Sequence, residues 1–247
     1  MPLDAITYRV RPGCEDDLME VFSPHNFTRV DSPVIKDDAG ATVGMLLGTG
    51  LFVQGDTVIR VIHHDGVSAA RVARHMSVQN GVHEAERAIL PFLVEPRDTE
   101  TPEGFRQHFH RSLMTALEQH SPDERPAAGT VALRHQLRKG AGAALALERG
   151  TVNRKASLLL SADHPTIVRT ALFLHEDTLV RVVQYDGHPY DVVGYLTDRC
   201  FGQDADAWLE PYLEHPARPD HPDAYLALVH EQAMISVAHM SVLGVDY

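Results

Sequence analysis

Positive charge is scarce in this chain. It has 22 Lys and Arg residues against 34 Asp and Glu residues, which gives a formal net charge of −12 at pH 7. Nucleic acids and anionic membrane surfaces are bound through basic patches. No stretch of this sequence has a cluster of Lys and Arg that could form such a patch. We therefore expect neither nucleic acid nor a membrane as a partner.

Long apolar runs and cysteines are also rare. No run approaches the ~18 residues of a membrane-spanning helix, and the start, MPLDAITYRV, lacks the charged and apolar regions of a secretion signal. The two cysteines, Cys14 and Cys200, are too few for a disulfide framework. Because free thiols are typical of a reducing compartment, a cytoplasmic protein is expected.

Motifs that would hold a cofactor are missing from the sequence as well. It has no GxGxxG after a predicted strand and no P-loop. His63 and His64 are adjacent on a predicted strand, so their side chains should point to opposite faces. His108 and His110 have no third ligand at a spacing typical of a metal site. We expect a protein that works without flavin, haem or metal.

The chain does contain an internal duplication, which indicates how it divides into domains. The stretch DTVIRVIHHDG at residues 56–66 returns 121 positions later as DTLVRVVQYDG at residues 177–187. LPFLVEP at 90–96 aligns with EPYLEHP at 210–216, and YRVRPG at 8–13 aligns with HQLRKG at 135–140. The polar segment SPDERPAAG is typical of a linker. The sequence therefore predicts repeats at residues 1–120 and 130–247, joined by a linker at 121–129.

Each repeat predicts the same order of elements. In the first repeat, alternating apolar residues predict a strand at 6–10, and a Gly-containing turn at 54–56 predicts a hairpin of strands at 43–53 and 57–64. A fourth strand is predicted at 111–118, and helical spacing predicts helices at 15–22, 67–76 and 82–90. This β-α-β-β-α-β order is ferredoxin-like. The strand at 57–64 is apolar on both faces, so its sheet should be covered on both sides. The predicted fold is α+β, with tandem ferredoxin-like sheets packed face to face as a dimeric-α/β-barrel-like pseudo-dimer, either monomeric or a homodimer.

Three stretches carry a resemblance to a known family. RVRPG, MLLGTGLFVQGDTVIRVIHHDG and PFLVEPRDTETPEGFRQHFHRSLM resemble the SchA/CurD-like family of polyketide spore-pigment and antibiotic clusters. The resemblance is close over residues 1–120 and weaker over the second repeat, where EPRDTETPEGF becomes HPARPDHPDAY. It implies a fold similar to that of antibiotic-biosynthesis monooxygenases, and a cofactor-free oxygenase that hydroxylates or oxidises an aromatic polyketide with O₂. An aromatase/cyclase, a non-redox polyketide-binding protein and a non-catalytic assembly partner stay open as alternatives.

Candidate catalytic residues follow from what such chemistry needs. A base must remove a proton from an electron-rich ring, and a cation should stabilise the enolate that results. Arg60, central on an apolar strand, is the candidate cation, and pairing with a carboxylate such as Asp56 is the alternative. His64 on the same strand face and His110, just before the fourth strand, are the candidate bases. Capping of the preceding helical segment is the alternative for His110.

Candidate substrate-binding residues are positions that repeat, or differ, between the two copies. They are Tyr8, His63, Met114, His135, Arg181, Trp208 and His230. Tyr8 and Trp208 fit a role in the core as well. Because Trp208 replaces Ala88 of the first repeat, the two repeats should differ in cavity volume. We expect the first repeat, which is closer to the family pattern, to be the active one.

Overall fold

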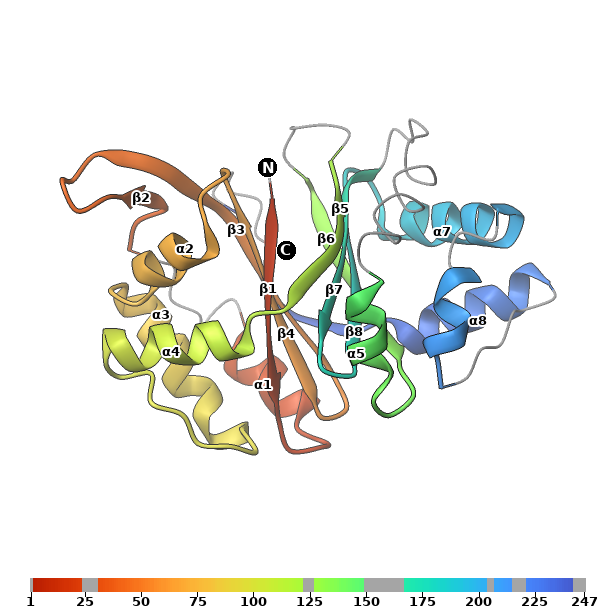
Figure 1. Cartoon of the computed structure of the whole chain (residues 1–247), viewed down its shortest axis with the longest axis horizontal. Coiled ribbons are helices and arrows are strands. Elements are labelled where there is room, and N and C mark those ends of the chain that lie inside the picture. The colour runs from red at the N-terminus through yellow and green to blue at the C-terminus, as the bar shows by residue number, and fades with distance from the viewer. Residues whose placement is uncertain are drawn as a thin grey trace. The chain divides into compact units, whose positions relative to one another are not determined.

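The chain forms two compact units, each built around one antiparallel sheet (Figure 1). A computed structural model describes residues 2–23, 31–121, 127–148, 167–203, 207–214 and 221–241. One unit comprises residues 1–114 with 235–247, and the other comprises residues 115–234.

The sheet of the first unit has five strands. They are β1 (Leu3–Arg9), β2 (Val34–Lys36), β3 (Thr42–Gln54), β4 (Thr57–His64) and β9 (Ile235–Ser241). The order is β1-β4-β3, and both β2 and β9 pair with β3. Gly55, at φ +58°, makes the short turn from β3 to β4, a left-handed conformation that glycine adopts without strain.

The helices of the first unit cover one face of this sheet. They are α1 (Glu15–Val21), α2 (Ala69–Met76), α3 (Asn80–Ile89), η1 (Leu90–Phe92) and α4 (Pro102–Ser112). Figure 1 shows α2, α3 and α4 together on one side of β1, β4 and β3. Ile6, Val58 and Ile62 of the sheet form one buried apolar cluster with helix residues that include Phe105 and Phe109.

The second unit repeats this plan with four strands. They are β5 (Thr115–His120), β6 (Gly129–Gln136), β7 (Ile167–His175) and β8 (Thr178–Tyr185), in the order β5-β7-β8-β6. Its helices are α5 (Ala141–Leu147), α7 (Pro189–Gln203), η2 (Ala207–Tyr212) and α8 (Pro222–Gln232). Within the described ranges, no helix has both the length and the apolar composition that crossing a bilayer requires.

The predicted α+β fold of two ferredoxin-like repeats is confirmed, with one strand exchanged in each direction. β5, the fourth strand of the first repeat, pairs with β7, and β9, the fourth strand of the second repeat, pairs with β3. The ends of β4 are those predicted, whereas β5 begins at Thr115 because α4 continues through Ser112. The sequence repeats and the compact units therefore differ by this exchange.

Candidate active site in the first unit

Two polar side chains lie on the helix-covered face of the first sheet. β1 and β4 pair so that Ile6 is opposite Arg60 and Tyr8 is opposite Val58. Because paired residues share a face, Tyr8 and Arg60 lie on the same side of the sheet. Tyr8 is 4% exposed and Arg60 is 5% exposed, so the sheet presents both side chains inside the core.

The partner of Arg60 comes from α3. This helix directs an apolar stripe at the sheet, and Glu86 occupies one position within that stripe with 1% of its surface exposed. Nη1 of Arg60 donates to Oε1 of Glu86 at 2.9 Å, and Nη2 of Arg97 donates to Oε2. One buried carboxylate therefore binds two guanidinium groups, one on each oxygen.

Arg97 lies in the loop between η1 and α4, and this loop is fixed to both neighbouring helices. A ring nitrogen of His83 on α3 is 2.9 Å from the carbonyl oxygen of Thr99. At Gly104 on α4, a Cβ would lie 2.7 Å from the backbone oxygen of Asp98, so this contact requires glycine. The close approach at Gly104 and the contact at His83 hold the segment that carries Arg97.

The Arg97 side chain also contacts two aromatic rings. Its guanidinium carbon is 4.1 Å from the ring centroid of Tyr8 on β1. Its Nη1 is 2.6 Å from Nε2 of His108 on α4. The rings of Tyr8 and His108 stack with centroids 5.4 Å apart and planes at 28°. We call Tyr8, Arg60, Glu86, Arg97 and His108 the Arg97 cluster.

The Arg97 cluster holds one net positive charge. Two guanidinium groups face one carboxylate. Burial, followed by the positive charges of Arg97, Arg111 and Arg60, lowers the pKa of His108 from 6.5 to about 3, so the imidazole is neutral. Burial and then the charge of Glu86 raise the pKa of Tyr8, against the opposing effect of the arginines, so the phenol is neutral as well.

The structure does not bring the two predicted bases to Arg60. His64 is on the same strand face but four positions farther along β4, roughly 13 Å away at about 3.3 Å per residue. Its Nε2 is 3.1 Å from Oδ2 of Asp4. His110 is exposed in the last turn of α4.

Three other residues named from the sequence, Asp56, His63 and Met114, have contacts or positions different from those of the Arg97 cluster. Asp56, the suggested partner of Arg60, binds Arg9 instead, so that pairing is corrected to Glu86. His63 is buried on the opposite face of β4 from Arg60. Met114 is buried after α4, and its N–H donates to the carbonyl oxygen of Ala5 at 2.8 Å.

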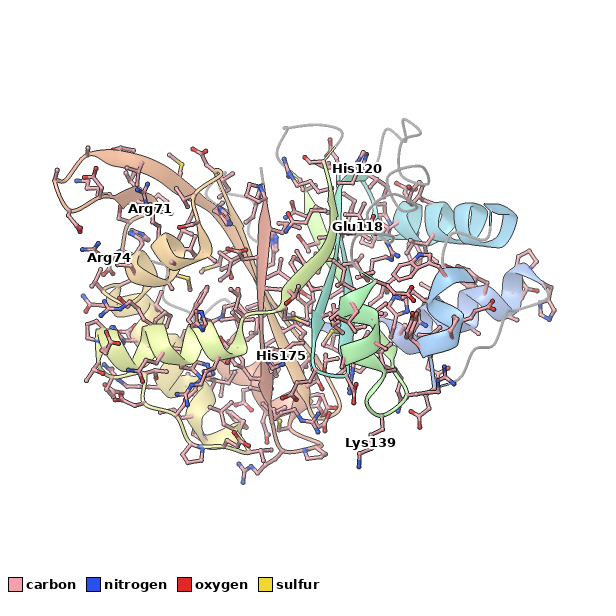
Figure 2. The ribbon with its side chains drawn as sticks, viewed as in Figure 1. Arg71, Arg74, Glu118, His120, Lys139 and His175 are labelled. Atoms are coloured by element: carbon pink, nitrogen blue, oxygen red, sulfur yellow. The ribbon has the colours of Figure 1, made fainter. Side chains whose placement is uncertain are left out.

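The second unit places its predicted residues on the corresponding elements. Arg181 is buried on β8 and His135 is buried on β6. Trp208 in η2 is partly buried against a leucine cluster, which is the core role considered for it, and His230 is exposed on α8. Glu118 and His120 lie on strand β5 of this unit (Figure 2).

The second repeat has a different set of residues at the positions of the Arg97 cluster. At the repeat offsets, Arg60 is matched by Arg181, but the other four members are replaced. His135, Asp206, Ala217 and Leu228 stand at the positions of Tyr8, Glu86, Arg97 and His108, respectively. At these offsets the combination of residue types is thus found only in the first repeat.

Sequence reasoning missed Glu86 and Arg97, and it weighed His108 only as a metal ligand. A signal for Glu86 was available, because a carboxylate within the apolar stripe of an amphipathic helix needs a buried partner. The signal for Arg97 and His108 was the comparison of the two repeats, since both positions become uncharged, aliphatic residues in the second copy.

Comparison with known proteins adds family relationships to this geometry. A family model described as SchA/CurD like domain matches residues 1–122 and 130–242. The chain is 33% identical over 189 residues to the 42.8 kDa protein in the whiE locus of Streptomyces coelicolor, an alignment covering 76% of this chain and 45% of that protein. It is 29% identical over 187 residues to polyketide synthase CurD of Streptomyces cyaneus, covering 75% and 48% of the two chains.

The chain thus spans about half the length of the curated relatives it matches. Among solved structures, that of an anthrone oxidase-like protein aligns over 98% of this chain and 94% of its own. The sequence identity in that alignment is 9%, and the TM-score is 0.39.

Proposed function

We propose, because the chain belongs to the SchA/CurD-like family, that it is a cofactor-independent oxygenase acting on an aromatic polyketide of the phenol or anthrone type. The observation that carries this proposal is the Arg97 cluster, a site in which two guanidinium groups share one buried carboxylate beside the stacked rings of Tyr8 and His108. A buried unbalanced cation is costly unless a counter-ion arrives, so the site favours an anionic ligand.

The anionic form of the substrate is what reaction with O₂ requires. Triplet O₂ reacts slowly with closed-shell molecules, so the substrate must become a strong one-electron donor. Loss of a phenolic or enolic proton achieves this, and preorganised cations stabilise the oxyanion that remains. In this proposal the charge of Arg60 and Arg97 makes that proton more acidic, and water takes it.

The proposed reaction balances without an external reductant. The substrate anion passes one electron to O₂, and the two radicals combine to form a carbon–oxygen bond. Loss of water from the resulting hydroperoxide leaves a new carbonyl group. An anthrone methylene thereby loses two hydrogen atoms and gains one oxygen atom, and the second oxygen atom leaves as water.

The differences between the repeats support assigning this chemistry to the first one. The second repeat keeps an arginine at Arg181, but the positions of Glu86, Arg97 and His108 hold other residues. Ala217 and Leu228 carry neither a guanidinium group nor an imidazole, so these two positions could not bind the same oxyanion. The second repeat would then supply β9 to the first sheet without sharing its chemistry.

The test is O₂ consumption with 1,8-dihydroxyanthrone as the probe, measured with the wild-type protein and with Arg97→Met. Removing one donor of a preorganised oxyanion site typically costs about 10²–10³-fold in rate. We expect O₂ uptake and quinone formation above the spontaneous rate for the wild type and little for the variant. Equal rates for the two proteins would contradict the proposal. Conversion of a linear polyketide substrate under argon would instead favour the aromatase/cyclase alternative.

A further inference from the structure

Two donors reach the same nitrogen of His108. Nη1 of Arg97 is 2.6 Å from Nε2, and Oγ of Ser112 is 3.3 Å from it. A guanidinium group has N–H donors and no acceptor, so Nε2 must accept and therefore carries no proton. In a neutral imidazole the proton is then on Nδ1.

The Nδ1 atom of His108 is available to a ligand. Every hydrogen bond that the described residues make to this ring ends at Nε2. Nδ1 is also not among the fully buried polar atoms that lack a partner. The stack against Tyr8 fixes the plane of the ring, and hence the direction of the Nδ1–H bond.

The surroundings keep this ring neutral. The charged groups that act on it are the guanidinium groups of Arg97, Arg111 and Arg60, all of which disfavour a further positive charge. Burial acts in the same direction, and together these effects lower the pKa of His108 to about 3. A neutral ring with Nε2 already occupied by a donor is poorly suited to accept a proton from the substrate.

We infer that His108 donates a hydrogen bond from Nδ1–H to the anionic oxygen of the substrate, and that it is not the base of the reaction. The identity of that oxygen, a phenolate or enolate, rests on the proposed function. Arg97 then has two roles: it supplies positive charge, and it selects the tautomer of His108. The arginines would then act on the bound anion through their charge and His108 through a direct hydrogen bond, because Nδ1–H points away from the nitrogen that Arg97 contacts.

The tautomer can be measured without any substrate. In ¹⁵N–¹H spectra, with His108 assigned by comparison with His108→Asn, we expect a protonated Nδ1 and an unprotonated Nε2 at neutral pH. Arg97→Lys keeps a donor to Nε2 and should keep this pattern. Arg97→Met removes the donor and should give a mixture of tautomers. A protonated Nε2 in the wild-type protein would overturn the inference.

Ligand binding gives the second measurement, made without O₂. The probe is 1,2-dihydroxyanthraquinone, whose ionised form absorbs at longer wavelength. We expect the wild type to bind it as the anion. His108→Phe keeps the ring stack but removes the donor, and should weaken binding roughly 10–100-fold. His108→Asn places an amide N–H close to the Nδ1 position and should retain most of the affinity.

The two variants separate this inference from the proposed function. Anion binding that His108→Phe leaves unchanged would contradict the donor role, even if the protein consumes O₂. Anion binding that depends on His108, in a protein that consumes no O₂ with an anthrone, would support the donor role and contradict the oxygenase.

Discussion

The guanidinium group of Arg97 lies over the ring of Tyr8, 4.1 Å from its centroid. A desolvated cation–π contact of this kind contributes about 2 kcal/mol. It joins a side chain from a loop to a side chain from a buried strand, and the bond to Glu86 adds a third element. Together these contacts fix the position of a loop side chain against a strand and a helix of the first unit.

Tyr8→Phe tests the role of the phenol. The Tyr8 hydroxyl is buried and makes no hydrogen bond of good geometry to a described residue, although Arg97 is near enough to lower its pKa, so its removal should cost little stability. Because burying an unsatisfied hydroxyl is unfavourable by about 1–3 kcal/mol, the variant should be equally stable or slightly more stable. Phenylalanine also keeps the ring under Arg97. Thermal unfolding measures the first effect, and a loss of anthrone oxidation in a stable variant would show that the hydroxyl contacts the substrate.

Arg60→Ala should affect stability and activity together. Breaking a buried ion pair by removing one partner costs about 3–5 kcal/mol, and losing an oxyanion donor costs about 10²–10³-fold in rate. Arg60→Lys should recover part of both losses, since an ammonium cannot reproduce the planar fork. Chemical denaturation and O₂ uptake on the same preparations provide the two values. A destabilised variant whose folded fraction is fully active would show that Arg60 is structural.

The matched control for that experiment is Arg181→Ala, at the repeated position on β8. We expect turnover close to that of the wild type, because the positions of Glu86, Arg97 and His108 are not kept in the second repeat. Equal losses from the two alanine variants would contradict the assignment of the chemistry to the first repeat.

The depressed pKa of His108 should appear in the pH dependence of stability. Between a folded pKa of about 3 and an ordinary value of 6.5, the unfolded chain binds a proton at this ring that the folded chain does not. Stability from this residue is therefore complete above pH 6.5 and is lost as the pH falls toward 3. The Tm difference between wild type and His108→Asn should shift in favour of the wild type as pH rises through this window. A constant difference would contradict the shift.

The fold was predictable because its signals are local and occur twice. A short run of valine and isoleucine residues defined β4, and the copy at β8 identified the repeat. The exchange of β5 and β9 was not predictable in the same way, because both pairings bury the same strands and keep the same alternation of side chains. Which sheet a fourth strand joins depends on tertiary contacts that no single stretch of sequence contains.

The Arg97 cluster was only partly predictable, for a related reason. Arg60 stood out as a charge among valines and isoleucines, and Tyr8 as an inward position of the first strand. Arg97 comes from a loop whose path depends on the close packing of Gly104 against Asp98. His64 was chosen as a base because it shares a strand face with Arg60, but the separation of four positions along β4 keeps the two side chains apart.

The strand exchange predicts how the first repeat behaves alone. A fragment of residues 1–120 contains β1 to β5 but lacks β9, so the edge of β3 at Gly48–Val53 loses its partner. An unpaired edge strand readily accepts a strand from another chain. In the full-length protein β5 pairs with β7, the repeat counterpart of β3. We therefore expect two fragments to exchange their β5 strands and form a two-fold symmetric dimer.

Sedimentation analysis measures whether the fragment of residues 1–120 is a monomer or a dimer, and a fragment of residues 1–114 is the matched control. The shorter fragment lacks β5 and has nothing to donate, so it should remain monomeric with reduced stability or aggregate through the open edge of β3. A stable monomer of residues 1–120 would mean that β5 can fold back onto its own sheet. The exchange would then not be required for each unit to fold.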